Sequence, residues 1–485
     1  MNIQNIWNLY KNMAAPVKAS LWFVFASVIQ KGISFVTTPI FTRLLSTEEY
    51  GLFNVYSSWY DIVAIFCTLH LAAGVYNKGM TKWNDDRDKL TSSFQGLSTV
   101  VTLLFFVVYL VFSEFWNDLL GLSSVLVMTL FCEALFIPAF EFWKASKRYD
   151  YSYKAIVLVS IAIGVISPIL GVIAIKNSAY KAEARIITFA LVQIVIGLFL
   201  YINNLRKGKC FFSKEYWVYA LKFNLPLIPH YLANTVLASS DRIMISKMVG
   251  TGEAGIYSVA YIISGIFSIV TIAINNSFIP FTYKAIKNNN ITKVRESSIV
   301  LVCLICGLCL FALCFGPELI LLISTPEYYE ARWVVPPVAI ATLFTFIYTL
   351  FSNVEFYFEK TKLVMVASSF AAILNIILNY IFIRISGYVA AAYTTLVCYM
   401  ALAMFHYCAY KYVCKKNNYK EEIYHEKTIF LITLISLILE FLFTLVYDNA
   451  WIRYLFVVVL LFVVLVKKNA VISAFAMIKA NDKKL

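Results

Sequence analysis

Charged side chains inside long apolar stretches are the residues of this sequence whose types and positions could do chemistry. They are the basic residues Lys31, Arg43, Arg242 and Lys247 and the acidic residues Asp61, Glu133 and Asp241. A charge at the centre of a bilayer costs about 2.5–3.5 kcal/mol on insertion scales, so such residues usually face a cavity and carry function. Lys binds an anionic group as a point charge and Arg as a planar fork. Carboxyl groups at this depth can bind cations or carry protons.

Each basic residue also has a structural interpretation. Lys31 and Asp61 lie at similar depth in the first two apolar stretches, and they could form a static ion pair. Arg43 and Lys247 lie at the ends of their stretches, where long side chains reach the membrane interface. Both the binding and the structural interpretation stay open for these residues.

The remaining charges and two prolines allow similar alternatives. Asp241 could pair or cap beside Arg242, and Glu133 could be a buried, protonated acid. The central position of Glu133 favours a role in proton coupling. Pro226 and Pro229 interrupt the hydrogen-bond ladder of the same stretch as Arg242, which predicts a bend or a hinge there.

The elements that position these residues are membrane-spanning helices. The chain is 61% apolar with a mean hydropathy of +0.76, and 14% of its residues are charged, whereas soluble domains average about 25%. A span needs about 20 mostly apolar residues. Fourteen runs meet this requirement, at 17–38, 51–75, 91–112, 119–142, 153–175, 184–202, 221–249, 255–280, 297–316, 333–357, 363–385, 387–410, 428–447 and 451–466. The sequence therefore predicts an all-α integral membrane protein of about fourteen spans.

The placement of the positive charge predicts the orientation. Of 41 Lys and Arg residues, 31 lie in alternate connections, beginning with the N-terminal tail, and nine lie in the intervening ones. Because cytoplasmic loops are enriched in Lys and Arg, both termini should be cytoplasmic. The net charge of +14 then faces anionic headgroups, which argues against nucleic acid as a partner.

A repeat divides the chain into two halves. Shifting "TRLLSTEEYGLF" forward by 204 residues aligns Arg43 with Lys247 and Gly51 with Gly255. Six spans separate the copies, so both lie on the extracytoplasmic side and the halves are parallel repeats. "EFW" at Glu141 and "EFY" at Glu355 are a second echo. We expect an N-lobe at 1–205 with spans 1–6, a C-lobe at 206–412 with spans 7–12, and spans 13 and 14 at 413–485.

The first repeated motif is expected to be mainly architectural. Its two glutamates, Glu48 and Glu49, would begin the second span, where carboxylates complement a helix N-terminus. Thr47 would be the N-cap, and Gly51 would allow another element to approach closely. Arg43 is the member of the motif with the strongest claim to a functional role.

Further segments resemble one family of transporters. They are "KGISFVTTPIFTRLLSTEEYGLF" from Lys31, "LPLIPHYLANTVLASSDRIMIS", "AGIYSVAYIIS", "SFIPF", "LNIILNYIFI" and "GYVAAAYTT". With two parallel six-helix bundles, the sequence resembles the Wzx-type polysaccharide flippases of the multidrug/oligosaccharidyl-lipid/polysaccharide (MOP) exporter superfamily. The likeness covers nearly the whole chain, but its motifs are packing patterns.

The resemblance implies a function. An undecaprenyl-diphosphate-linked oligosaccharide would be moved from the cytoplasmic to the outer leaflet of a bacterial inner membrane, for O-antigen or capsular polysaccharide synthesis. Its diphosphate would be bound by the basic residues Lys31, Arg43, Arg242 and Lys247. Ion coupling or charge pairing would involve Asp61, Glu133 and Asp241. Entry of H⁺ or Na⁺ could drive transport, and a polysaccharide polymerase and a chain-length regulator are possible partners.

Three other functions compete with this one. A drug or cation antiporter of the same superfamily would need an acidic cavity, whereas the first spans of both lobes are basic. A membrane polysaccharide polymerase would, by resemblance, carry a large outer loop that this sequence lacks. No metal triad, nucleophile elbow or phosphate-binding glycine loop is present, so we expect no enzyme activity, metal or cofactor. A lipid II-type flippase stays open, because charge does not distinguish it.

Overall fold

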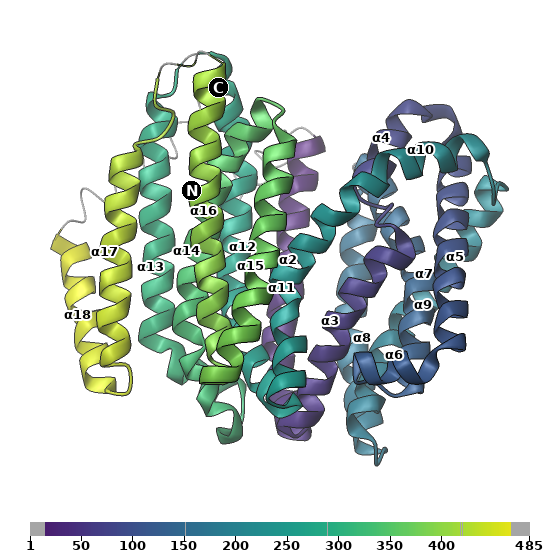
Figure 1. Ribbon diagram of the computed structural model, residues 1–485, viewed down its shortest axis with the longest axis horizontal. Coiled ribbons are helices and arrows are strands. Elements are labelled where there is room, and N and C mark those ends of the chain that lie inside the picture. Colours follow the sequence, from purple (N-terminus) through teal and green to yellow (C-terminus); the bar gives the residue numbers. More distant parts are fainter. Residues whose placement is uncertain (1–14, 151, 289, 418, 420, 467–485) are drawn as a thin grey trace, which may run out of the picture. The chain divides into compact units, whose positions relative to one another are not determined.

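Helices account for every regular element in the part of the chain that the structure describes. The computed structural model (Figure 1) describes residues 15–466 except 151, 289, 418 and 420. The predicted all-α class is confirmed. Contacts divide the chain into two compact units, Met1–Gly255 and Ile256–Leu485. The lobe boundaries predicted at residues 205 and 412 stay predictions.

The first unit begins with a long helix and contains several short ones. Its elements are α2 (Ala15–Leu44), α3 (Thr47–Thr68), α4 (Gly74–Lys82), η1 (Asn84–Asp86), α5 (Arg87–Val111), α6 (Ser113–Leu120), α7 (Ser124–Tyr149), α8 (Tyr153–Lys176), α9 (Lys181–Gly208), α10 (Lys214–Asn224), η2 (Leu225–Leu227) and α11 (Ile228–Met248).

The second unit contains most of α12, because the first turn of that helix belongs to the first unit. Its elements are α12 (Thr251–Lys287), α13 (Thr292–Ile323), η3 (Pro326–Trp333), α14 (Val335–Tyr357), α15 (Thr361–Ser386), α16 (Ala390–Lys416), α17 (Glu426–Leu445) and α18 (Ala450–Val466). Within this unit α14 packs on α16 and α13, and α17 packs on α13.

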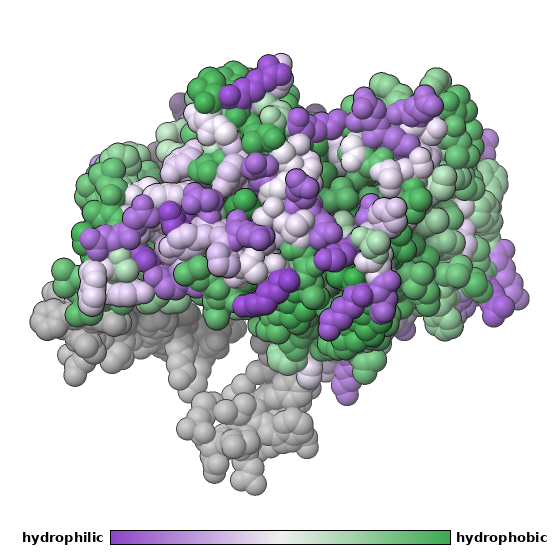
Figure 2. Space-filling model, turned by 90° about the horizontal axis from the view of Figure 1, so that it is seen from below, coloured by the Kyte–Doolittle hydropathy of each residue, from purple (hydrophilic) through white to green (hydrophobic). Residues whose placement is uncertain are grey.

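Ten helices in the described residues are long and apolar enough to cross a membrane. They correspond to ten of the fourteen predicted spans, which supports a multi-pass membrane protein. The predicted first, second, seventh and fourteenth spans, which fall on α2, α3, α10–α11 and α18, stay predictions. Figure 2 shows a mixed face, on which hydrophilic side chains lie among hydrophobic ones.

Two predicted spans are interrupted. The stretch predicted at 51–75 ends as a helix at Thr68, because Leu69 and His70 adopt left-handed backbone conformations with φ of 51° and 49°. The stretch predicted at 221–249 breaks after Asn224 into a short 3-10 turn that contains Pro226, and α11 then begins at Ile228. Proline lacks an N–H and clashes with the preceding turn, which explains the second break.

The N-terminus of α3 corrects the expected cap. Ser46 and not Thr47 is the N-cap, since the Ser46 hydroxyl accepts a hydrogen bond from the Glu49 N–H at 3.2 Å. The Glu49 carboxylate accepts in return from the Ser46 N–H at 2.9 Å, which completes a capping box. Thr47 is instead the first helical residue.

Each glycine of the repeated motif packs against the segment that contains the other one. A Cβ at Gly51 would overlap the carbonyl oxygen of Thr251, and a Cβ at Gly255 would overlap that of Thr47. The first turn of α12 therefore crosses the start of α3 at backbone contact. This confirms the expected close approach at Gly51 and shows that the two copies of the motif meet.

Candidate functional site: the α3–α11 helix pair

Helices α3 and α11 hold most of the predicted site residues that the structure describes, and they pack extensively on each other within the first unit. Asp61 of α3 is exposed, and its carboxylate accepts a hydrogen bond of 3.2 Å from the hydroxyl of the buried Ser239 on α11. Asp61 therefore joins the two helices and keeps part of its surface exposed.

The predicted partner of Asp61 lies outside the side chains that the structure describes. Lys31 belongs to α2, but nothing is placed for its side chain. The predicted Lys31–Asp61 interaction thus stays a prediction. The structure gives Asp61 a hydrogen bond from Ser239, which the sequence analysis did not anticipate.

Two arginines of the predicted cationic set donate to their own helices. Arg43 is exposed and donates from Nη1 to the Pro39 carbonyl at 2.8 Å. Arg242 is half-buried and donates from Nη1 to the Ala238 carbonyl at 2.9 Å. Each guanidinium carries five N–H donors in a fixed fork, a geometry that suits phosphate and carboxylate oxygens.

The other charged residues of α11 differ in exposure. Lys247 is exposed in the last turn of the helix, where a cation also complements the helix dipole. Asp241 is buried, with 2% of its surface exposed. Of these two, Lys247 has the exposure that a headgroup-binding residue needs.

Glu133 is buried between α7 and α3. It lies on α7 with 2% exposure, and its carboxylate accepts a hydrogen bond of 2.6 Å from the Tyr56 hydroxyl of α3. Sequence analysis missed Tyr56, because its partner Glu133 is 77 residues away and no local pattern connects the two. Helix α3 therefore carries one exposed acid and one hydroxyl bound to a buried acid.

The second unit encloses polar pairs that the sequence analysis had not assigned to a site. His406 Nδ1 of α16 lies 2.7 Å from Glu355 Oε1 of α14, and neither side chain is more than 2% exposed. Arg453 of α18 forms a two-pronged ion pair with Glu318 of α13, with both bonds at 2.7 Å. These residues hold helices of the second unit together.

Comparison with known proteins defines the class. A family model described as polysaccharide biosynthesis protein matches residues 17–285, which is more than half of the chain, and a MatE model matches residues 226–381. The chain belongs to the polysaccharide biosynthesis protein family, within the MOP exporter superfamily of transporters. The resemblance inferred from the sequence is confirmed.

Particular relatives fit this class. The Haemophilus influenzae "Lsg locus putative protein 1" is 20% identical over 366 residues, which cover 74% of this chain and 89% of that protein. The Rhizobium meliloti "succinoglycan biosynthesis transport protein ExoT" is 24% identical over 245 residues, which cover 49% of this chain and 48% of that protein.

Solved structures show the same fold. The lipid II flippase MurJ in an inward closed conformation has a TM-score of 0.67 and 16% identity, with 93% of this chain and 100% of that chain covered. An inward-facing multidrug resistance MATE family transporter has a TM-score of 0.62 and 13% identity, with 80% and 96% covered. At these identities the likeness concerns the fold.

Proposed function

We propose that this transporter moves undecaprenyl-diphosphate-linked oligosaccharides from the cytoplasmic to the outer leaflet of the bacterial inner membrane, by alternating access. One observation supports this most directly. Helices α3 and α11 pack on each other and carry Asp61, Arg242 and Lys247. Charged side chains at membrane depth are expected where they line a water-filled path.

The cations suit a diphosphate headgroup. Arg43, Arg242 and Lys247 lie on α2 and α11, and Lys31 of α2 would complete the predicted set. Arginine binds phosphate oxygens through two parallel N–H bonds and lysine adds a point charge. No bond is made or broken in the lipid, so the protein needs only to shield the headgroup while it crosses.

Membrane potential can drive this step. A headgroup with two negative charges leaves an inside-negative cell, and each charge gains about 2.3 kcal/mol per 100 mV. Roughly 4–5 kcal/mol would come from the potential, equivalent to some three orders of magnitude in the equilibrium. An imposed inside-negative potential should therefore speed outward transfer at equal pH and equal Na⁺.

Coupling to H⁺ or Na⁺ would need a carboxylate that solvent reaches. Asp61 is exposed, whereas Glu133 is buried and accepts a hydrogen bond from the Tyr56 hydroxyl. Between the two predicted candidates, exposure favours Asp61 as the group that exchanges a cation. Pro226, in the break before α11, and Pro229, in its first turn, are proposed as the hinge that lets the helix move.

Transport by purified protein tests the proposal. Proteoliposomes receive labelled undecaprenyl-diphosphate oligosaccharide, lipid II or a quaternary ammonium drug in separate assays. We expect transfer of the first substrate, and a loss of tenfold or more in Arg242→Gln, about the effect of 1.4 kcal/mol. Lys181→Gln, an exposed lysine at the start of α9, is the control and should transport normally. Transfer of lipid II or of the drug in place of the oligosaccharide would contradict the assignment.

A further inference from the structure

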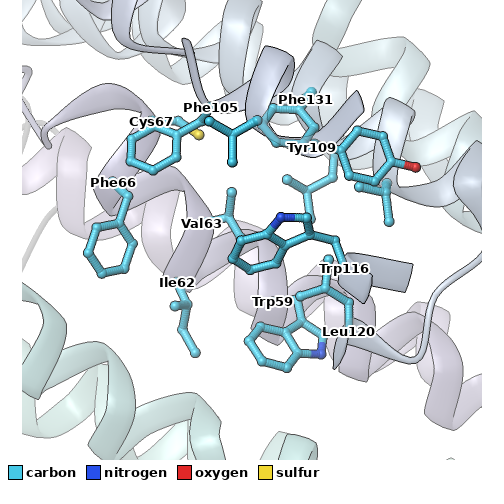
Figure 3. A pocket seen from close by; sticks show the side chains of 13 residues that line it. Trp59, Ile62, Val63, Phe66, Cys67, Phe105, Tyr109, Trp116, Leu120 and Phe131 are labelled. Atoms are coloured by element: carbon cyan, nitrogen blue, oxygen red, sulfur yellow. The ribbon is translucent and has the colours of Figure 1, made fainter. Parts of the chain in front are cut away.

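A cavity of about 320 Å³ lies between α3, α5, α6 and α7 of the first unit. Figure 3 shows the rings of Trp59, Trp116, Phe105 and Phe131 around it. Among its lining side chains, Tyr109 directs its hydroxyl to Asn117 Oδ1 at 3.1 Å. A buried water needs two to four polar partners, and this lining does not provide them.

The size of the cavity points to an elongated apolar occupant. Apolar cavities of about 150 Å³ stay dry and bind a molecule as small as benzene. The present cavity has roughly twice that volume. It would accommodate a stretch of hydrocarbon chain better than a water cluster or a charged headgroup.

The mouth of the cavity lies on a surface of bilayer-facing character. Three lining residues are more than a third exposed, Phe66 at 37%, Phe105 at 41% and Val108 at 44%. On α5 they continue into further exposed apolar side chains at Leu104 and Val107. Lipid chains therefore meet this mouth wherever α5 crosses the bilayer.

We propose that the cavity binds one acyl chain of a bilayer phospholipid, inserted laterally between α3 and α5. Phospholipids are the bulk component at this surface, so they fill the site by mass action. A polyprenyl tail is a scarce competitor and is far longer than the cavity. This proposal does not depend on which headgroup the transporter moves.

The bound chain would connect bilayer and transport site through α3. Trp59, Val63 and Phe66 line the cavity, while Tyr56 and Asp61 of the same helix make the contacts to Glu133 and Ser239. On an α-helix Tyr56 falls on the same face as Trp59 and Val63, three and seven residues further on, whereas Asp61 falls on a different face. A chain in the cavity thus supports the side of α3 that is turned away from Asp61.

Two tryptophan substitutions on one helix test the proposal. Val108→Trp fills the mouth, and Val107→Trp places the same side chain on the neighbouring position, which is 56% exposed and does not line the cavity. Native mass spectrometry of the full chain, released from phosphatidylethanolamine–phosphatidylglycerol nanodiscs, counts retained phospholipids. We expect Val108→Trp to retain one phospholipid fewer than the wild type and Val107→Trp to retain the same number.

Fluorescence gives a second, independent readout. Phospholipids brominated at mid-chain should quench the Trp59 and Trp116 emission, and the Trp59→Phe/Trp116→Phe variant should lose that quenched fraction. Equal phospholipid retention by both Val→Trp variants, with no difference in quenching between wild type and double variant, would overturn the proposal. Preferential retention of added undecaprenyl phosphate over phospholipid in the wild type would also overturn it, since the occupant would then be the polyprenyl tail.

Discussion

Two arrangements of polar side chains contrast with each other: Asp61 of the first unit is exposed, or open, and the Glu355–His406 pair of the second unit is buried, or closed. Asp61 and Arg43 are exposed and make single hydrogen bonds to a neighbouring helix or to their own backbone. Glu355 and His406 are almost fully buried and bind each other at 2.7 Å. In hydrocarbon an unsatisfied polar group is costly, so polar groups either satisfy one another or face water. The difference separates residues available to a substrate from residues that hold helices together.

A buried amide and hydroxyl network extends the closed pattern. Asn375 Nδ2 of α15 donates to the Thr395 hydroxyl of α16 at 3.0 Å, and Asn379 Nδ2 donates to Asn375 Oδ1 at 3.3 Å. The Thr394 hydroxyl donates to Asn379 Oδ1. All four side chains are buried. They tie α15 to α16 in the second unit, as Tyr56 and Glu133 tie α3 to α7 in the first.

The EFW and EFY echo shows how equal positions acquire different environments. Glu141 of α7 pairs with Lys144 of its own helix at 2.6 Å and keeps 44% of its side chain exposed. Glu355 of α14 is fully buried against His406 of α16. The repeated EFW/EFY motif predicts where the glutamate lies along the chain. The neighbouring helix determines whether its carboxyl group is exposed or buried.

Breaking the closed Glu355–His406 pair should give the largest effect. His406→Ala leaves a buried carboxyl without its partner, which typically costs about 3–5 kcal/mol. We expect a marked fall in Tm in detergent and in the amount of folded protein. A double-mutant cycle with Glu355→Ala measures the coupling, and additive losses would show that the two side chains do not stabilise each other.

Tyr56→Phe tests whether burial makes a polar contact important for stability in the first unit as well as in the second. It removes the donor to the buried Glu133 carboxylate and leaves an acceptor unsatisfied, at a cost of about 1–3 kcal/mol. We expect a smaller but clear decrease in Tm. Tyr60→Phe, on the same helix, is the matched control because the structure gives no hydrogen bond to its hydroxyl among the described residues. Equal stability of the two variants would contradict the distinction between open and closed sites.

Much of the fold was predictable because the relevant forces are local. Long apolar runs predicted the ten helices that are able to span a membrane, since backbone groups in lipid must be satisfied within a helix. Helix ends were less accurate. Ser46 and Thr47 are both good caps, and only the backbone conformation, extended at Ser46, shows which one acts.

The site was predictable in kind but not in pairing. Charges in apolar runs indicated Asp61 and Glu133, because an ionisable residue at membrane depth is costly and usually has a functional role. Their partners Ser239 and Tyr56 are 178 and 77 residues away in the sequence, and no local pattern connects them. Which hydroxyl meets which carboxylate depends on how helices pack, and sequence periodicity does not determine that.

The smallest change in stability is expected for a substitution at the exposed Asp61. The same substitution should change transport strongly. Asp61→Asn keeps the size of the side chain and an oxygen that can accept from Ser239. Its free energy of unfolding should therefore stay within about 0.5 kcal/mol of the wild-type value. It removes the charge, so a cation exchanged at Asp61 would no longer bind. Transport in proteoliposomes should then lose its response to an imposed pH or Na⁺ gradient and keep its response to membrane potential. If Asp61→Asn lowered Tm as much as Tyr56→Phe does, Asp61 would be a structural residue like those of the second unit. Ser239→Ala separates the two roles, because it removes the hydrogen bond and leaves the charge; we expect it to keep the gradient response.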